Sequence, residues 1–442
     1  MRATRLGRIL AAGVGLVAAS GCSLLAPSDA ELRGSARDAG VALSDASGAD
    51  GEPTADGGVS YAPLDAKDAW ATFDPTSLLA AARGYAGGTF DGSYVYFAPS
   101  GTGLVLRCDT RKDFGSAAAW SVFDTTSLDA GATQFTGAIF DGRYVYFVPF
   151  GEGHARFFAR YDTTGEFSSA GAWAVFDSTT VKAGVQGFVG GTFDGRYLYL
   201  APKANELNNA SGLFTRYDTR APFGDASSWT TFETSALDST ANGFGGAVFD
   251  GRFVTLVPFD NELPDSVTVR FDTQASFGAA ASYETFALAK LAPSLGGFLG
   301  GAFDGRYVYF APSRPAAATS VVRVDTQGSF ASSWSRFDAK TLTAGSGGFA
   351  GGAFDGRHVY LVPGKPNAAL VRYDTRAAFD VATSWTSFDV GTVSPGTQGF
   401  AGAIFDGRAL YLVPREGSRA ARFGVRAPAE LPALPSFHGS FL

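Results

Sequence analysis

The residues best suited to bind a ligand lie in two polar segments, 203–209 and 260–265. Their side chains are carboxylates, amides and one amine: Lys203, Asn205, Glu206, Asn208 and Asn209 in the first segment, and Asp260, Asn261, Glu262 and Asp265 in the second. Such groups hydrogen-bond to sugars and peptides, and carboxylates can also form an acid/base pair or hold calcium. We take these residues as the candidate binding site. The alternative is that both segments are long loops that only stay solvated.

Metal and nucleophilic chemistry find little support in the residue types. Of the 3 histidines, His358 falls in a predicted strand, His438 in the C-terminal tail and only His154 in a variable loop. No histidine cluster is therefore expected, and the sequence has no Gly-x-Ser-x-Gly elbow or phosphate-binding loop. We predict no catalytic residue, no metal and no cofactor.

The N-terminus resembles a bacterial lipoprotein signal. Arg2, Arg5 and Arg8 are followed by an apolar run over 9–19, and small residues then lead directly to Cys22. This pattern is typical of a secretory signal peptide, 1–21, and its end resembles a lipobox, in which the cysteine becomes acylated. The resemblance implies that Cys22 begins the mature chain and carries lipid, such as palmitate, that holds it on a membrane. The alternative is an ordinary cleaved signal with an incidental cysteine.

The composition bounds the class of partner. Removing the signal takes away three arginines and no acids, so the net charge goes from −7 to −10, which argues against nucleic acid. Residues 22–60 are rich in Ala, Gly, Ser, Asp and Pro and predict a flexible tether, and the proline-containing segment 427–442 predicts an extended tail. No second apolar run approaches the ~20 residues that span a bilayer.

Residues 61–426 repeat one pattern. A Phe-Asp-Gly sequence recurs at intervals of 50–56 residues, with its aspartate at Asp91, Asp141, Asp194, Asp250, Asp304, Asp355 and Asp406. Asp-Gly between two apolar runs predicts a β-hairpin, which we expect to close through a type I′ turn with positive φ at both residues. A period near 50 residues with several short strands is typical of a propeller blade. The sequence therefore predicts an all-β, seven-bladed β-propeller.

Each repeat contains four predicted antiparallel strands, here named A to D. Strand A is rich in glycine, which places it where the blades crowd around the axis. Strand B is apolar on both faces and ends at a proline. Strand C ends in Arg-aromatic-Asp-Thr in most repeats, and its arginine and aspartate share a face and are expected to pair. Cys108 replaces the aromatic residue in the first repeat, so it is predicted to be a buried thiol.

Strand D begins with an aromatic residue and predicts how the ring closes. This position accounts for all 6 tryptophans of the chain, and we expect the rings to pack between blades. The first predicted strand is a D strand at Trp70, and the last is a C strand at Arg422-Phe423. The last blade therefore lacks a D strand of its own, and the N-terminal strand at Trp70 must complete it.

The repeat resembles the kelch family of propellers. The hairpin over 353–362, the strand over 371–375 and the pair Ser384-Trp385 carry the resemblance, which recurs over 68–425. Kelch repeats have a Gly-Gly pair at the end of strand B, where this chain has proline. The resemblance implies a galactose-oxidase-type propeller that binds proteins or sugars, as kelch-like propellers usually do; a few are oxidases. A copper oxidase would need paired histidines and a cysteine near a tyrosine, which the histidine positions do not supply.

Variation among the repeats distinguishes two faces. The distance from the strand D aromatic to the next turn aspartate is always 21 residues, whereas the distance from that aspartate to the strand C aspartate varies from 18 to 24. The variable B–C loops share one side with the D–A connections, here named the loop face, and the hairpin turns lie on the opposite turn face. Six turns are followed by arginine, with Ser93 as the exception: Arg143, Arg196, Arg252, Arg306, Arg357 and Arg408. This ring either binds a polyanion or is simply solvated.

These patterns predict a monomeric propeller lipoprotein of a bacterial cell envelope, on the periplasmic or cell-surface side, that binds a protein or carbohydrate on its loop face. One alternative is a hydrolase or lyase with carboxylates at the mouth of the axial channel. The other is a purely structural envelope component.

Overall fold

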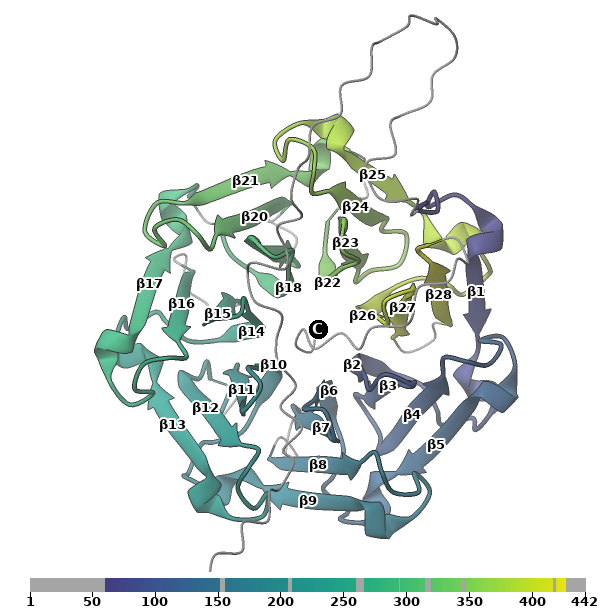
Figure 1. Ribbon diagram of the computed structural model, residues 1–442, viewed down its shortest axis with the longest axis horizontal. Helices are drawn as coiled ribbons and strands as arrows, with labels where there is room; N and C mark the ends of the chain where they lie inside the picture. The colour runs from purple at the N-terminus through teal and green to yellow at the C-terminus, as the bar shows by residue number, and fades with distance from the viewer. Residues whose placement is uncertain are drawn as a thin grey trace, which may run out of the picture. The chain divides into compact units, whose positions relative to one another are not determined.

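Seven four-stranded antiparallel sheets surround a common axis (Figure 1). The structure is a computed structural model that describes residues 60–151, 156–205, 209–259, 266–293, 295–314, 319–342, 347–415 and 419–426. In each sheet the strands follow the order A, B, C, D from the axis outward. The predicted seven-bladed propeller is confirmed. The predicted signal peptide, Cys22 and the tail 427–442 lie outside the described residues.

Each position of the blade is occupied by one strand from every sheet. The A strands are β2 (Tyr85–Phe90), β6 (Phe135–Phe140), β10 (Phe188–Phe193), β14 (Phe244–Phe249), β18 (Phe298–Phe303), β22 (Phe349–Phe354) and β26 (Phe400–Phe405). The B strands are β3 (Tyr94–Pro99), β7 (Tyr144–Pro149), β11 (Tyr197–Pro202), β15 (Phe253–Pro258), β19 (Tyr307–Pro312), β23 (His358–Pro363) and β27 (Ala409–Pro414). The C strands are β4 (Leu104–Asp109), β8 (Phe157–Asp162), β12 (Leu213–Asp218), β16 (Val267–Asp272), β20 (Ser320–Asp325), β24 (Leu370–Asp374) and β28 (Ala420–Gly424). The D strands are β5 (Trp120–Asp124), β9 (Trp173–Asp177), β13 (Trp229–Glu233), β17 (Tyr283–Ala287), β21 (Trp334–Asp338), β25 (Trp385–Phe388) and β1 (Trp70–Phe73). Blades one to seven begin at β2, β6, β10, β14, β18, β22 and β26, in that order.

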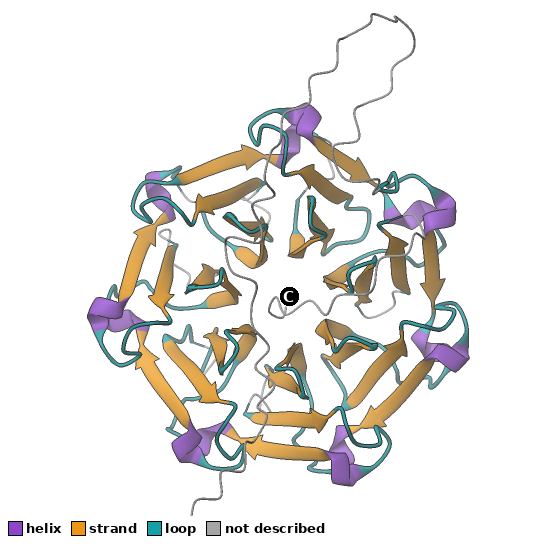
Figure 2. Ribbon diagram, in the orientation of Figure 1, coloured by secondary structure: helices purple, strands orange, loops and turns teal. Residues whose placement is uncertain are grey.

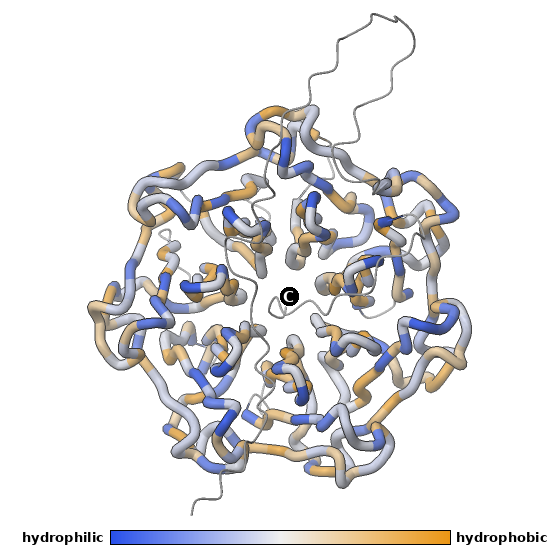
Figure 3. Tube along the Cα trace, viewed as in Figure 1, coloured by the Kyte–Doolittle hydropathy of each residue, from blue (hydrophilic) through white to orange (hydrophobic). Residues whose placement is uncertain are grey.

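Short 3₁₀ helices flank the D strands at the outer corners of the ring (Figure 2). Those before a D strand are η1 (Lys67–Ala69), η3 (Ala117–Ala119), η5 (Ala170–Ala172), η7 (Ala226–Ser228), η9 (Ala280–Ser282) and η12 (Ala382–Ser384). Those after a D strand are η2 (Pro75–Ser77), η4 (Thr125–Ser127), η6 (Ser178–Thr180), η8 (Thr234–Ala236), η10 (Leu288–Lys290), η11 (Ala339–Thr341) and η13 (Val390–Thr392). Hydrophobic residues run along the strands, and hydrophilic segments fall mainly at the turns (Figure 3).

The A–B hairpin differs from the predicted type I′ turn. In the second blade Gly142 has φ 102°, but Asp141 is not among the residues with positive φ. The Asp141 carboxylate instead accepts the backbone N–H groups of Arg143 at 2.8 Å and Tyr144 at 2.6 Å. The prediction of positive φ at both residues is therefore wrong: only the glycine has positive φ, and the side chain of the aspartate closes the turn.

Glycine lets the A strands approach one another at the axis, as the sequence predicts. Gly246 has φ 146°, and a Cβ atom built on it would lie 3.1 Å from the Cα atom of Gly300 in the next blade. A Cβ atom on Gly191 would lie 2.2 Å from the carbonyl oxygen of Tyr199 in the neighbouring strand. Larger residues at these positions would push strands or blades apart.

An aromatic stack joins each blade to the next at the outer edge. The phenylalanine of one D strand lies against the first residue of the following D strand, as Phe123 does against Trp173 with ring centroids 4.3 Å apart. The other six stacks are Phe176–Trp229, Phe232–Tyr283, Phe286–Trp334, Phe337–Trp385, Phe388–Trp70 and Phe73–Trp120. The predicted packing of these rings between blades is confirmed.

The N-terminal strand closes the ring. β1 pairs with β28 in antiparallel register, with Trp70 opposite Phe423. The preceding residues also contribute: the indole N–H of Trp70 donates to the carbonyl of Leu64 at 2.8 Å, as that of Trp120 donates to Phe114 in the first blade at 2.9 Å. In the first blade the accepting carbonyl belongs to Phe114, in the connection between strands C and D. The last blade has no such connection, because its D strand is N-terminal, and the carbonyl of Leu64 takes this role.

Truncating Trp70 should open this closure. We expect Trp70→Ala to lower the free energy of unfolding by about 3–5 kcal/mol, because a buried ring, an interblade stack and an indole hydrogen bond are lost. Trp70→Phe keeps the stack and should lose much less. Guanidinium melts of both variants test this, and equal losses would show that stacking at Trp70 does not hold the ring closed.

Candidate functional site

In six of the seven blades, an arginine on the turn face forms an ion pair with the aspartate that ends strand C. The arginine that follows the turn forms an ion pair with the aspartate that ends strand C, at 2.7 Å in each of the pairs Arg143–Asp162, Arg196–Asp218, Arg252–Asp272, Arg306–Asp325 and Arg357–Asp374. The hydrogen bond from Arg143 lowers the pKa of Asp162 to about 2. In the first blade, where Ser93 replaces the arginine, Arg111 pairs with Asp109 instead. These pairs favour a structural role for the arginine ring over a polyanion site.

The strand C arginines do not pair with the strand C aspartates, contrary to the prediction. The guanidinium of Arg107 lies 4.2 Å from the ring centroid of Tyr94 in its own blade and 4.1 Å from that of Phe167 in the next blade. Arg160, Arg216, Arg270 and Arg323 are held in the same way. The prediction fails because the aspartate is closer to the turn arginine across the hairpin, and this leaves the strand C guanidinium to bridge two blades through cation–π contacts.

One turn aspartate lacks the partner that the others have. In six blades a strand B tyrosine donates its hydroxyl to the turn carboxylate, as Tyr146 does to Asp141 at 2.7 Å. The fourth blade has Thr255 at this position, and the Oδ2 atom of Asp250 is buried without a hydrogen-bond partner. Burial raises the pKa of Asp250. This carboxylate is a local weakness of the fourth blade.

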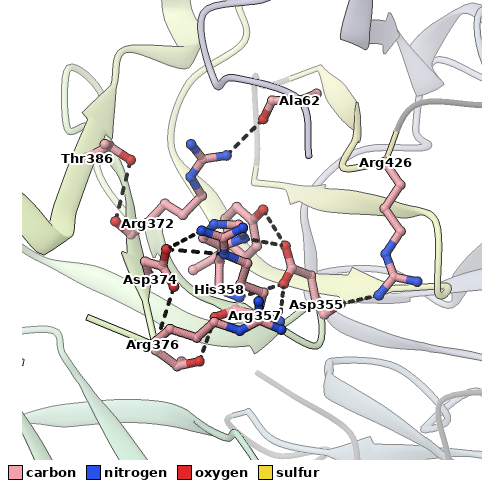
Figure 4. A network of polar contacts seen from close by, with 11 residues as sticks. Ala62, Asp355, Arg357, His358, Arg372, Asp374, Arg376, Thr386 and Arg426 are labelled. Carbon is pink, nitrogen blue, oxygen red and sulfur yellow. Dashed lines mark hydrogen bonds and ion pairs between the residues drawn. The ribbon is translucent and has the colours of Figure 1, made fainter. Parts of the chain in front are cut away.

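Two side chains from the sequence analysis are structural. Nδ1 of His358 lies 3.1 Å from Oδ2 of Asp355, and its ring meets the edge of Tyr61, in a network where Arg372 also donates to the carbonyl of Ala62 (Figure 4). Cys108 is buried, as predicted, and burial raises its pKa to about 12. His154 and His438 lie outside the described residues. Within the described ranges, no three His, Cys, Asp or Glu side chains form a metal-binding group.

The loop face holds the described part of the predicted binding site. Lys203 and Asn205 lie at the base of the third-blade B–C loop, where the N–H of Ser211 donates to the carbonyl of Lys203 at 3.0 Å and the N–H of Asn209 donates to Oδ1 of Asn205 at 3.1 Å. The remaining predicted residues lie outside the described ranges: Glu206, Asn208, Asp260, Asn261, Glu262 and Asp265. The structure therefore places three of the nine predicted residues, Lys203, Asn205 and Asn209, all in one loop.

A hollow of about 380 Å³ opens beside this loop. Its polar lining comes from the B–C loop, the end of β13 and the D–A connection that follows it: Asn205, Ser211, Glu233, Ser235 and Asn242. The preceding D–A connection adds only Ala183 and Gly184. Oδ1 of Asn242 is buried without a hydrogen-bond partner, while its Nδ2 donates to the carbonyl of Ser239 at 3.1 Å. A hollow with such a polar lining favours a ligand that forms hydrogen bonds with it.

Glu233 and Asn242 were not predicted as site residues from the sequence. In five blades the residue corresponding to Glu233 is an aspartate whose carboxylate caps the 3₁₀ helix that follows, as Asp124 does by accepting the N–H of Thr126. The carboxylate of Glu233 makes no such cap and accepts the hydroxyl of Ser235 at 2.5 Å. The change from aspartate to glutamate at one repeat position was the signal available in the sequence.

Lys203 adds an aromatic contact at the inner rim of the loop face. Its ammonium lies 5.0 Å from the ring centroid of Phe150 in the second blade and 4.7 Å from that of Phe259 in the fourth. Lys203 follows the proline that ends strand B, and its N–H donates to the carbonyl of Gly187, just before strand A, at 3.0 Å. The side chain is therefore held near the axis by blades two to four.

Solved structures share this architecture. The extracellular domain of a hybrid two-component system from B. thetaiotaomicron matches with a TM-score of 0.54 at 10% identity over 82% of this chain and 44% of that one. YCF48 bound to D1 peptide matches with 0.51 at 12% over 83% and 100%, and virginiamycin B lyase from Staphylococcus aureus with 0.50 at 11% over 77% and 94%. The chain is a β-propeller. No protein-family model matches the sequence, and no curated protein matches it either. At these identities the likeness shows the fold alone.

The unpartnered Oδ2 atom of Asp250 predicts an unusual effect of amide substitution. Its pKa is raised above the ordinary 3.8, so the stability that it contributes is present below that value and is lost as the pH rises through the folded-state pKa. Asp250→Asn should therefore increase the free energy of unfolding at pH 7. This increase should become smaller as the pH falls towards 4.

Asp304→Asn is the matched control in the next blade. There the substitution removes the acceptor of the Tyr309 hydroxyl, so it should destabilise by about 1–3 kcal/mol. Denaturant melts at several pH values test both variants. If both variants lose stability at pH 7, the Oδ2 atom of Asp250 is not without a partner.

Proposed function

We propose that this chain is a membrane-anchored, extracytoplasmic propeller that binds a protein or carbohydrate ligand on its loop face. The observation that carries the proposal is the polar hollow beside the third-blade B–C loop, with the buried, unpartnered Oδ1 atom of Asn242 among its lining residues. The structural neighbours include an extracellular domain and a protein solved with a bound peptide, which is compatible with a binding role.

The N-terminal sequence supports the anchor. The charged start, the apolar run and the small residues before Cys22 resemble a lipoprotein signal. The repeats resemble those of kelch propellers, which usually bind proteins or sugars, and this supports a binding role for the anchored domain. No helix among the described residues is long and apolar enough to cross a membrane. The described chain starts beside the turn face, since Tyr61 bridges to Arg426 and Arg426 donates to the carbonyl of Asp355 in a turn.

The carboxylate-based hydrolase or lyase gains no support from the hollow. Glu233 is its one titratable lining residue among those described, whereas such chemistry uses a pair of carboxylates. Glu206, Asp260 and Glu262 lie outside the described residues and so add nothing to either proposal.

Substitution in the hollow tests the binding role. The full chain is screened against arrays of neutral oligosaccharides and of peptides, and the best binder is then measured by calorimetry. We expect Asn242→Ala combined with Glu233→Gln to weaken that binding by about three- to tenfold or more, because hydrogen bonds to the ligand are lost. Asp177→Asn, at the position in the second blade that corresponds to Glu233, is the control and should bind normally. Binding that survives the first variant, or no binder on either array, would contradict the proposal.

Cys22 tests the anchor separately. Cys22→Ser should move the protein from the membrane fraction to the soluble fraction of a bacterial expression host and abolish metabolic labelling with a palmitate analogue, because the acylated residue is removed. Cys108→Ser changes the only other cysteine, which is buried, and should leave both unchanged. Membrane association that persists in Cys22→Ser would exclude lipidation as the anchor.

A further inference from the structure

Basic side chains gather at one part of the inner rim of the loop face. The residues that follow strand B in blades five, six and seven include Arg314, Lys365 and Arg415, here named the basic arc. Each follows the proline that ends its B strand by one or two residues. Three consecutive blades therefore present one cation each just after strand B.

Backbone hydrogen bonds fix these residues to the start of the innermost strands. The N–H of Arg314 donates to the carbonyl of Gly297 at 3.1 Å, and the N–H of Arg415 donates to Gly399 at 3.4 Å. In the sixth blade the N–H of Gly364, next to Lys365, donates to Gly348 at 3.0 Å. The basic arc thus lies around the axis and not at the outer edge of the ring.

The side chains fold over glycine. A Cβ atom on Gly348 would lie 3.0 Å from Cε of Lys365, and one on Gly297 would lie 2.9 Å from Cβ of Arg314. Lys365 stands on a tight turn, in which Asn367 has φ 63° and the N–H of Ala368 donates back to the carbonyl of Lys365 at 3.3 Å. Backbone therefore lies under the side-chain end of Lys365, whereas the guanidinium of Arg314 lies 5.1 Å from the ring centroid of Phe259.

The side chain of Arg415 is partly exposed to solvent and partly covered by other protein atoms. Its Nε donates to the carbonyl of Phe400 at 2.9 Å, and no described carboxylate pairs with its guanidinium. The residue keeps solvent-exposed surface, while the surrounding protein desolvates it and lowers its pKa. Lys365 is likewise exposed and has no ion pair with a described carboxylate. These cations differ from the turn-face arginines, most of which hold an aspartate at 2.7 Å.

The sequence of the loops gives this part of the face a charge opposite to that of its neighbour. The B–C loops of blades five to seven carry Arg314, Lys365, Arg415 and Arg419 against a single acid, Glu416, although the protein as a whole has a net charge of −7. The fourth-blade loop over 259–266 carries three acids and no base. A local excess of cations on an acidic protein favours an anionic ligand at that place.

We propose that the basic arc binds an acidic polysaccharide through its carboxylate or sulfate groups. The repeat places one cation on each of three neighbouring blades, which suits a polymer with an anion in each repeating unit. Gly297 and Gly348 lie beside the side chains of Arg314 and Lys365, so backbone takes up much of the described surface there. Apart from the ring of Phe259 beside Arg314, this surface gives the side chains of a peptide little to pack on. The arc is separate from the hollow at Asn242, and neither site requires the other.

The test uses the full chain in mild detergent and four probes: polygalacturonate, dextran sulfate, poly-L-glutamate and neutral dextran. Wild-type protein should bind the two acidic polysaccharides at low ionic strength, with an affinity that falls as salt is added, and should not bind neutral dextran. Arg314→Glu/Lys365→Glu/Arg415→Glu should weaken this binding by about tenfold or more.

The matched control is Lys290→Glu/Arg336→Glu/Lys340→Glu. It makes the same change in net charge at the outer edge, on η10, β21 and η11, and should change the affinity by no more than about twofold. Thermal melts check that each variant folds. If the arc variant does not, Lys365→Glu alone replaces it, since this exposed side chain makes no described hydrogen bond, and a loss of about twofold or more is then expected.

Three results would overturn the proposal. Equal losses in the arc and control variants would mean that only net charge matters. Failure of wild-type protein to bind either acidic polysaccharide would remove the site. Tighter binding of poly-L-glutamate than of both polysaccharides would assign the arc to an acidic polypeptide. Glu233→Gln/Asn242→Ala, measured with its own neutral ligand, reports on the proposed function independently of these outcomes.

Discussion

One aromatic contact, repeated at every blade boundary, holds the ring together. A phenylalanine of each D strand stacks on the first residue of the next D strand, with centroids 4.0–5.5 Å apart. That residue is tryptophan or tyrosine because its N–H or O–H donates to a carbonyl in the preceding connection, as Tyr283 does to Phe277 at 2.6 Å. Such a stack contributes about 0.5–1.5 kcal/mol beyond burial. Each blade supplies one ring to the stack with the preceding blade and one ring to the stack with the following blade. No blade therefore completes its outer edge alone.

The same contact ties the first strand of the propeller to its last two blades. Trp70 must stack on Phe388 of the sixth blade while its own strand pairs with β28, so the N-terminal and C-terminal strands are held in one sheet. The segment before it adds further contacts, with the N–H of Ala62 donating to the carbonyl of Val425 at 2.9 Å and Arg372 donating to the carbonyl of Ala62 at 2.9 Å. Closure thus joins three parts of the chain that are distant in sequence.

Periodicity made the ring predictable from the sequence, because strand positions, buried aromatic residues and the offset of Trp70 are all set by spacing along the chain. The partners of charged groups were not predictable in this way. Arg143 and Asp162 are 19 residues apart and meet only through the register of β7 and β8, whereas the closer pair on strand C was expected to interact. The turn conformation was missed for a similar reason, since the carboxylate of Asp141 competes with the backbone for the same N–H groups. At the candidate site, Asn205 was found because its loop is long, but Glu233 differs from the repeat by a single methylene.

Departures from the repeat therefore carry more information than the repeat itself. On the turn face most basic residues have an acidic partner in the same blade, so the charges there support folding and leave little for a ligand. On the loop face Glu233 does not cap a 3₁₀ helix as its counterparts do. Lys365 lies over Gly348, Arg415 donates to the carbonyl of Phe400, and neither has a described acidic partner. A fold that satisfies its polar groups so regularly elsewhere would not need such groups for its own stability. Their place on one face, around one axis, is what ligand binding requires and what folding does not.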